Sequence, residues 1–211
     1  MGPARQWSVL VFSLGLACGM RAPAAEFTLT PAENQRVSAR QVVMRANLDS
    51  TQRRGTVRAA VRIEAPPDVV FRMMINCADA LEYVPHLRQC RVRDRAADDS
   101  WMLVENAIDF GWYSPRVKWI SRADLIPNRR IAFRQVSGDF KAYEGVWEFE
   151  PTDDGTTTLL LYQAFIDPPG FVPNWLARST FRRDMPGMLT ELRRRSEAEQ
   201  SSHAATNASP H

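Results

Sequence analysis

The sequence is poor in the residues that most often carry enzyme chemistry. It holds three histidines, and two of them, His203 and His211, lie at the C-terminal end, which leaves His86 within the body of the chain. Cys77 and Cys90 near this lone histidine do not make a zinc ligand set. No G-x-S-x-G, H-E-x-x-H, Walker or dinucleotide-binding glycine pattern is present. We therefore expect no metal and no cofactor, and a binding protein more than an enzyme.

Long apolar runs are lacking except at the N-terminus. There Arg5 precedes a largely apolar stretch over 7–20, followed by small residues that end at Ala24. The run is too short to span a bilayer, and its layout predicts a secretory signal peptide over 1–24 with cleavage near Ala24. The mature protein is then periplasmic or secreted. An uncleaved anchor, or a lipoprotein attached through Cys18, are the alternatives.

A strong charge of either sign is also absent from the predicted mature chain. The full sequence has 27 basic and 24 acidic residues, for a net charge of +3. Removing the signal peptide takes away Arg5 and Arg21 and no acid, which leaves +1. Because the surface is nearly balanced, we do not expect a nucleic-acid partner.

Two cysteines remain after the predicted cleavage, Cys77 and Cys90. An exported protein meets an oxidising compartment, where a bridge between them would stabilise the fold by about 2–4 kcal/mol. Two separate buried thiols are the equally supported alternative.

The first half of the chain predicts strands and two short helices. Residues 25–36 are polar and are interpreted as a lead-in, and 37–45 as a short first strand. Apolar residues then alternate with polar ones over 56–64, as in a half-buried strand. Prolines and an acid open a helix over about 67–77, and a second short helix covers 79–83.

The second half predicts a meander of strands and one long helix. Residues 90–166 contain about six antiparallel strands, with a hairpin signal at 153–155. Apolar residues then recur at helical spacing from about 173 to 198, with a kink expected at Pro186. Residues 199–211 are small and polar and are predicted to be a disordered tail.

This order predicts a single α+β domain over 37–198. We expect a curved antiparallel sheet of about six or seven strands, two short helices after the first strand, and a long C-terminal helix over the sheet.

Several strings resemble a known superfamily in their order along the chain. They are "VRIEAPPDVVFRMMINCADALEYVPHL" (61–87), "GDFKAYEGVWEFEPTDDGTTTLLLYQAFIDPPGFVPNW" (138–175) and the last helix with its Pro186. Together they resemble the START-like (SRPBCC, Bet v 1-like helix-grip) superfamily, and are most similar to bacterial START and coenzyme Q-binding (polyketide cyclase/dehydrase-like) proteins.

The resemblance implies an apolar ligand cavity between the sheet and the last helix. The aromatic and methionine side chains expected to bind the ligand are Trp119, Phe133, Trp147, Phe149, Tyr162, Trp175, Phe181, Met185 and Met188. The alternative is that the same side chains only pack the sheet against the helix. Likewise, Pro168–Gly170 and Pro186 indicate either a hinge that lets a ligand enter, or only a loop and a helix kink.

Three polar residues fall within one predicted strand. Glu105, Asn106 and Asp109 are candidates to orient a ligand's polar head or to act as a general base, if one of them faces inward. Polar strand residues more often face solvent, so catalysis is not the leading prediction.

The resemblance implies a protein that holds a lipid or other apolar ligand, such as a phospholipid or an isoprenoid quinone, and transfers it with transient membrane contact. The predicted signal peptide implies that this protein is exported. A cyclase/aromatase-like enzyme using the same cavity, or a protein-interaction module without a small ligand, are the alternatives.

Overall fold

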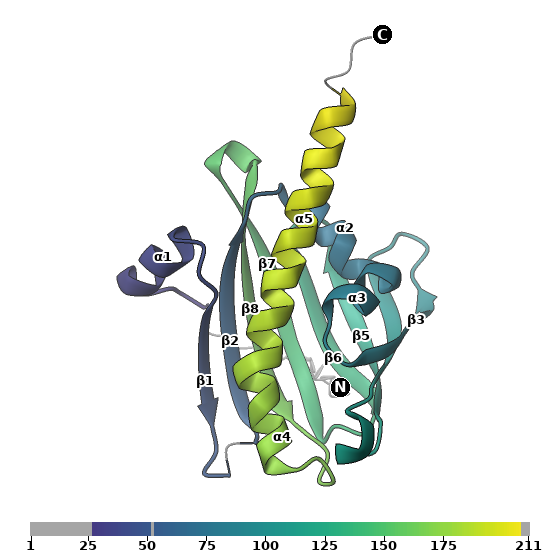
Figure 1. The fold of residues 1–211 in the computed structure, drawn as a ribbon. Coiled ribbons are helices and arrows are strands. Elements are labelled where there is room, and N and C mark those ends of the chain that lie inside the picture. The colour runs from purple at the N-terminus through teal and green to yellow at the C-terminus, as the bar shows by residue number, and fades with distance from the viewer. Residues whose placement is uncertain (1–26, 52, 208–211) are drawn as a thin grey trace, which may run out of the picture.

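A computed structural model describes residues 27–51 and 53–207 of the protein. The predicted signal peptide over 1–24 lies outside the described residues. Eight strands form one antiparallel sheet in the order β1-β2-β8-β7-β6-β5-β4-β3 (Figure 1). They are β1 (Val43–Leu48), β2 (Gly55–Ile63), β3 (Leu87–Arg95), β4 (Trp101–Ile108), β5 (Val117–Ile126), β6 (Arg130–Gly138), β7 (Ala142–Thr152) and β8 (Thr157–Asp167).

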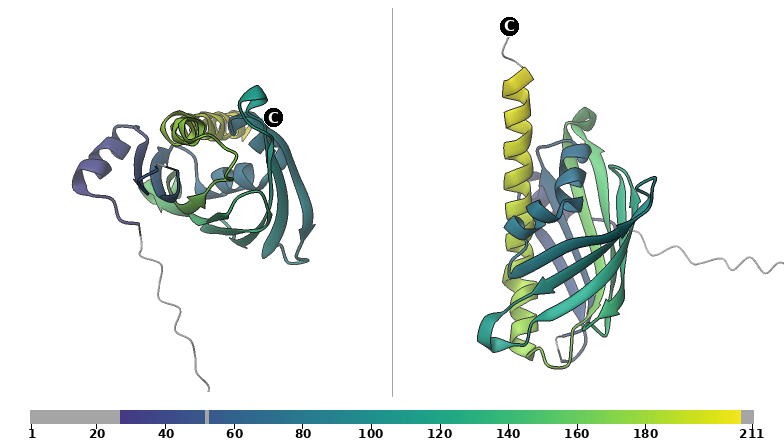
Figure 2. Two further views of the ribbon diagram at one scale, coloured as in Figure 1. Left: turned by 90° about the horizontal axis from the view of Figure 1, so that it is seen from below. Right: turned by 90° about the vertical axis from the view of Figure 1, so that its right-hand side faces the viewer.

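Helices α2 and α3 and the C-terminal helix gather on the concave face of this sheet (Figure 1). The helical elements are α1 (Pro31–Ser38), α2 (Pro67–Ile75), α3 (Cys77–Tyr83), the strand-connecting turns η1 (Gly111–Tyr113) and η2 (Asp153–Gly155), α4 (Asn174–Ser179), the π-helical turn η3 (Thr180–Asp184) and α5 (Met185–Asn207). Figure 2 shows the sheet curving around the long C-terminal helix. The predicted α+β class is therefore confirmed. None of the helices in the described part of the chain is long and apolar enough to cross a membrane.

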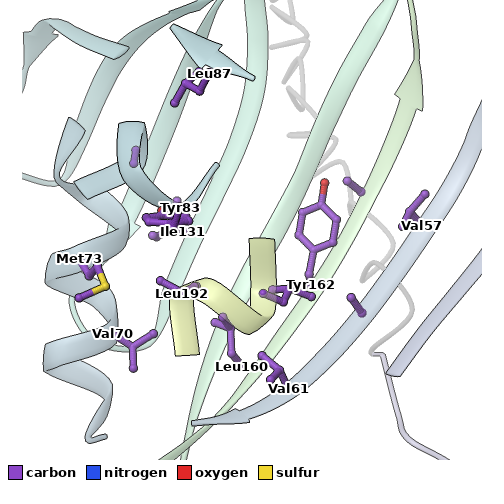
Figure 3. Close-up of a cluster of buried hydrophobic side chains, with 14 of the residues drawn as sticks. Val57, Val61, Val70, Met73, Tyr83, Leu87, Ile131, Leu160, Tyr162 and Leu192 are labelled. Atoms are coloured by element: carbon purple, nitrogen blue, oxygen red, sulfur yellow. The ribbon is translucent and has the colours of Figure 1, made fainter. Parts of the chain in front are cut away.

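The main core lies between the sheet and α2 and α5. Figure 3 shows Leu192 of α5 between Val70 of α2 and Leu160 of β8. All three side chains are buried. Because a strand exposes alternate side chains to opposite faces, the alternating residues of β2 and β8 supply this core from the sheet side.

The predicted lead-in is wrong, because residues 31–38 form helix α1. Thr30 caps the helix: its hydroxyl accepts from the Glu33 amide, and the Glu33 carboxylate accepts from the Thr30 amide. This reciprocal capping box is visible in the sequence as T-P-A-E. The helix packs on the convex face of the sheet, where Val37 joins a small cluster with Val43 and Leu161. The first strand accordingly begins at Val43, later than predicted, and α2 and α3 follow the second strand.

The C-terminal helix differs from its prediction in two ways. Its irregularity is the π-helical turn at Thr180–Asp184, just before Pro186. A proline lacks an N–H and its ring clashes with the carbonyl four residues earlier, so a widened turn in front of it relieves both problems. The helix also continues through Asn207, so 199–207 is not a disordered tail. Glu199 there lies 3.5 Å from Arg72 of α2, a contact that helps to hold the extension.

The two cysteines of the described chain are joined. Cys77 opens α3 and Cys90 lies in β3, and a disulfide bridges them with a Cα–Cα distance of 5.1 Å. The bridge fixes α3 against the edge of the sheet, which is one wall of the cavity described next.

Candidate ligand cavity

A cavity of about 320 Å³ lies between the concave face of the sheet and the helices. Its wall takes side chains from five neighbouring strands, β3 to β7, from β8, and from α2, α3 and the C-terminal helix. The volume is near the lower end of the range for small-molecule sites, and the wall is largely apolar, as such sites are.

Seven of the nine side chains predicted from the resemblance lie together in this wall. The strands contribute Trp119, Phe133, Trp147 and Tyr162, and the C-terminal helix contributes Phe181, Met185 and Met188. The period of two within each strand predicts this, because the four strand residues share the face that is turned toward the helix.

The other two do not line the cavity. Phe149 shares the inner face with Trp147, but α2 covers that end of the sheet, and the Phe149 ring packs edge-on against Phe71 at 5.5 Å between centroids. Trp175 is exposed on the first turn of α4, where Leu176 and Ala177 are buried instead. Both residues therefore lie outside the cavity wall, because apolar character alone does not show which element covers a position.

Aromatic rings pack closely across the sheet side of the cavity. Trp147 lies 4.1 Å from Tyr162 and Phe133 stacks on Tyr162 at 6.3 Å, both between ring centroids. Phe140 and Tyr143 extend this layer beside Trp119. Phe140 and Tyr143 were not among the predicted site residues. Tyr143 could have been found, because it shares the parity of Trp147, but Phe140 lies between two strands where no periodic signal exists.

Two buried hydroxyls of the wall are unpaired. Neither Oγ of Ser121 nor Oη of Tyr162 has a hydrogen-bond partner within the described residues. Figure 3 shows the Tyr162 hydroxyl directed away from Leu160, along the strand. The hydroxyl of Tyr143 lies near that of Tyr162 but falls short of a regular hydrogen bond. Burial is the main cause that raises the pKa of Tyr162 well above its ordinary value, and the nearness of Tyr143 adds to it. The phenol therefore stays protonated and can donate a hydrogen bond.

Asn106 adds a third polar group beside Ser121. It faces Trp119 across β4 and β5, while Ser121 faces Val104, so Asn106 and Ser121 are diagonal neighbours on one face of the sheet. Of the three polar candidates near this strand, only Asn106 lines the cavity. Glu105 is turned to the other face and pairs with Arg93 at 2.7 Å, and Asp109 pairs with Arg116 at 2.9 Å.

One carboxylate lies at the cavity wall. Asp184 of the π-helical turn is the single acid among the lining residues that the structure describes, and no Lys, Arg or His accompanies it in the wall. Its Oδ2 lies 3.8 Å from Nε2 of His86, whose ring is 5.1 Å from that of Phe110.

Comparison with known proteins gives a family and a fold. The model of a family described as "Polyketide cyclase / dehydrase and lipid transport" matches residues 63–193, which include the sheet from the end of β2 and most of the C-terminal helix. No curated protein matches the chain.

Solved structures share the arrangement at low identity. The STAR-related lipid transfer protein of Xanthomonas axonopodis superposes with a TM-score of 0.61 at 19% identity, over 74% of this chain and 92% of that one. The protein TTHA0849 of Thermus thermophilus gives 0.58 at 22% identity, over 69% and 99%. The Zhui aromatase/cyclase of Streptomyces sp. R1128 gives 0.56 at 18%, over 74% and 99%. At these identities the likeness shows the helix-grip fold and leaves the ligand open.

Proposed function

Since this chain belongs to the polyketide cyclase/dehydrase and lipid transport family, we propose that it is an exported protein that binds a lipid or another mainly apolar molecule bearing a polar oxygen group. The observation that carries the proposal is a cavity whose apolar wall contains two unpaired buried hydroxyls, those of Ser121 and Tyr162.

The apolar wall provides the affinity. Each methylene group that leaves water for such an environment contributes about 0.8 kcal/mol. Met185 and Met188 of the C-terminal helix form part of the wall, and their flexible thioethers adapt to ligands of varied shape. The ordered rings of Trp147 and Tyr162 form the opposite side and give the ligand a fixed surface to pack on.

The polar groups select the ligand. A buried hydroxyl without a partner costs about 1–3 kcal/mol, so a ligand oxygen that pairs with Tyr162 or Ser121 recovers that cost. A pure hydrocarbon would leave both hydroxyls unpaired. The ligand class is therefore an acyl or prenyl compound that carries a carbonyl, hydroxyl or ester group, with Asn106 able to donate or accept beside it.

Export is supported by the disulfide. Bridges persist in oxidising compartments and are rare in the cytosol, and Cys77–Cys90 ties α3 to β3. The test is fractionation of cells that produce the full chain with a C-terminal tag, followed by mass measurement. A periplasmic or secreted product that begins near residue 25 supports export. A full-length product confined to the cytosol contradicts export but does not bear on ligand binding in the cavity.

Binding is tested by displacement of a fluorescent fatty acid from the purified protein. Ala123 lines the cavity between Met102 and Phe133, its register partners on the neighbouring strands, so Ala123→Phe should fill the space and abolish binding. The matched control is Ala132→Phe, which places the same ring on the other face of the sheet and should bind normally. Phospholipids and isoprenoid quinones as competitors then rank the ligand class. Equal binding by the two variants would contradict the proposal.

A second candidate is cyclase-type catalysis, favoured by one observation. Asp184 lies at the wall with His86 3.8 Å away, and a carboxylate with a neighbouring imidazole supplies groups able to transfer protons to and from a folded polyketone chain. Incubation with a linear poly-β-ketone analogue, followed by mass spectrometry, tests it. Cyclisation that is lost in His86→Gln would support the enzyme, and no turnover above the uncatalysed rate would exclude it.

A further inference from the structure

Four large aromatic side chains are exposed together at one end of the molecule. They belong to two connections, η1 between β4 and β5, and the segment from β8 into α4, both at the lower end in Figure 1. The left view of Figure 2 looks at this end. The exposed fractions are 87% for Trp112, 47% for Tyr113, 45% for Phe171 and 52% for Trp175.

Ring contacts join the two connections into one surface. Trp112 lies 4.1 Å from Tyr113, and Tyr113 meets Trp175 edge-on at 5.3 Å, both between centroids. Single exposed apolar residues are ordinary on protein surfaces, but a contiguous group of this kind marks an interaction site. We call Trp112, Tyr113, Phe171 and Trp175 the aromatic end.

The cavity reaches the same two connections. Phe110 immediately precedes η1, and Pro168, Pro169 and Val172 flank Phe171 in the segment before α4, and all four line the cavity. A partner at the aromatic end would therefore lie next to the cavity wall.

Positive charge borders the aromatic end. Arg178 follows Trp175 by three residues, which places both on one side of α4, and Arg182 and Arg183 follow in the π-helical turn. All three arginines are exposed, and none forms an ion pair with another residue in the described part of the chain. Of the nearby acids, Asp109 is paired with Arg116 at 2.9 Å, and Asp184 lies 3.8 Å from His86.

We propose that the aromatic end is a docking surface for an anionic phospholipid bilayer. Tryptophan and tyrosine rings favour the headgroup level of a membrane, where an apolar body and a polar edge are both accommodated. The three arginines reach the lipid phosphates, and each cation near an anionic surface adds attraction. The proposal rests on the proposed function, because a bilayer is the place from which a lipid ligand is taken or to which it is delivered.

Vesicle co-sedimentation tests the surface. The mature protein is mixed with vesicles of phosphatidylethanolamine and phosphatidylglycerol, or of phosphatidylcholine alone. We expect binding to the anionic vesicles, and a fall of about tenfold in Trp112→Ala/Trp175→Ala, because two rings then leave the interface. The matched control is Trp101→Ala, which removes a tryptophan from the opposite end of β4 and should bind as the unmodified protein does.

A second variant tests whether the arginines bind the lipid phosphates. Arg178→Gln/Arg182→Gln should weaken binding to anionic vesicles by roughly fivefold for each arginine, and change binding to phosphatidylcholine little. Thermal unfolding of every variant is followed, because Trp101 is half-buried whereas Trp112, Trp175, Arg178 and Arg182 are exposed, and each variant should stay folded.

The outcomes separate this proposal from the proposed function. Equal sedimentation of the Trp112→Ala/Trp175→Ala and Trp101→Ala variants, or binding to neither vesicle type, overturns the docking surface even if the fatty-acid probe still binds. Vesicle binding with no uptake of the probe overturns the cavity function and leaves the surface standing. Capture of a protein by the aromatic end without any vesicle binding shows a protein interface and also overturns the proposal.

Discussion

Trp147 and Tyr162 are register partners on β7 and β8, and their rings lie against each other with centroids 4.1 Å apart. Phe133 also stacks on Tyr162, with centroids 6.3 Å apart. The Tyr162 ring thus contacts two other rings, and its hydroxyl lies in an apolar wall with no hydrogen-bond partner among the described residues. Under the proposed function, this unpaired donor is the group expected to recognise the ligand, because an unpaired buried hydroxyl does not stabilise the fold.

Removing that hydroxyl separates recognition from folding. In Tyr162→Phe the ring contacts remain and the unpaired group disappears, so the free energy of unfolding of the empty protein should stay the same or rise by about 1 kcal/mol. Affinity for an oxygen-bearing ligand should fall by about tenfold, the loss of one good hydrogen bond. Denaturant unfolding and probe displacement measure the two effects. A variant that is destabilised while affinity is unchanged would show that the hydroxyl is structural.

A charge in the wall should empty the cavity. Trp147→Arg places a guanidinium on the sheet side of the cavity wall, where its register partners Ile131 and Tyr162 offer no acid. Because this buried charge is unpaired, an apolar ligand can no longer pack there. We expect ligand occupancy to be lost while export continues. Val146→Arg is the control, because the neighbouring residue points to the outer face of the sheet. Retained occupancy in Trp147→Arg would show that this side chain does not contact the ligand.

The disulfide should be a large part of the stability of the α3–β3 wall. Loss of the Cys77–Cys90 bridge in a double alanine variant should lower the free energy of unfolding by about 3 kcal/mol, as expected for a loop of this length. Equilibrium unfolding in denaturant measures it, and the unmodified protein in strong reductant should match the variant. If reductant has no effect on the unmodified protein, the two thiols are not joined in solution.

Helix α1 should loosen in acid. A hydrogen bond from Arg45, with further ones from the amide and hydroxyl of Thr30, lowers the pKa of Glu33 from 4.5 to about 2. Because the folded-state pKa is the lower one, the stabilisation is present above pH 4.5 and is lost as pH falls toward 2. Amide hydrogen exchange at Val37, corrected for the intrinsic rate, should show added opening in that window.

Glu33→Gln is the matched control for this effect. Glutamine can still complete the capping box but does not titrate, so the added opening should disappear. The same acid sensitivity in the variant would assign the effect to another group.

Much of the fold follows from local patterns, and the site follows only in part. Alternation along β4 and β7 predicts which side chains face inward, and Trp147 and Asn106 are where that alternation places them. Whether an inward position lines a space or a packed core depends on which helix lies over it. Phe149 is covered by α2 while Trp147 is not, and nothing within β7 distinguishes them.

Helix α1 and the extension 199–207 were not predicted, for two different physical reasons. The T-P-A-E capping box that begins α1 is a helix signal, but it lies in a polar segment whose composition is more typical of a loop. The helical extension 199–207 lacks an apolar face, and its contact between Glu199 and Arg72 joins residues far apart in the chain. A pairing of that kind leaves no periodic trace in the sequence.

The most direct test of the central claim is native mass spectrometry of the protein purified from the cells that produce it. We predict a mass excess equal to a lipid or prenyl compound bearing an oxygen group, present in the unmodified protein and in Ala132→Phe, and absent from Ala123→Phe. A protein that carries no ligand in any of the three, and that takes up none from a lipid extract, would contradict a ligand-binding cavity.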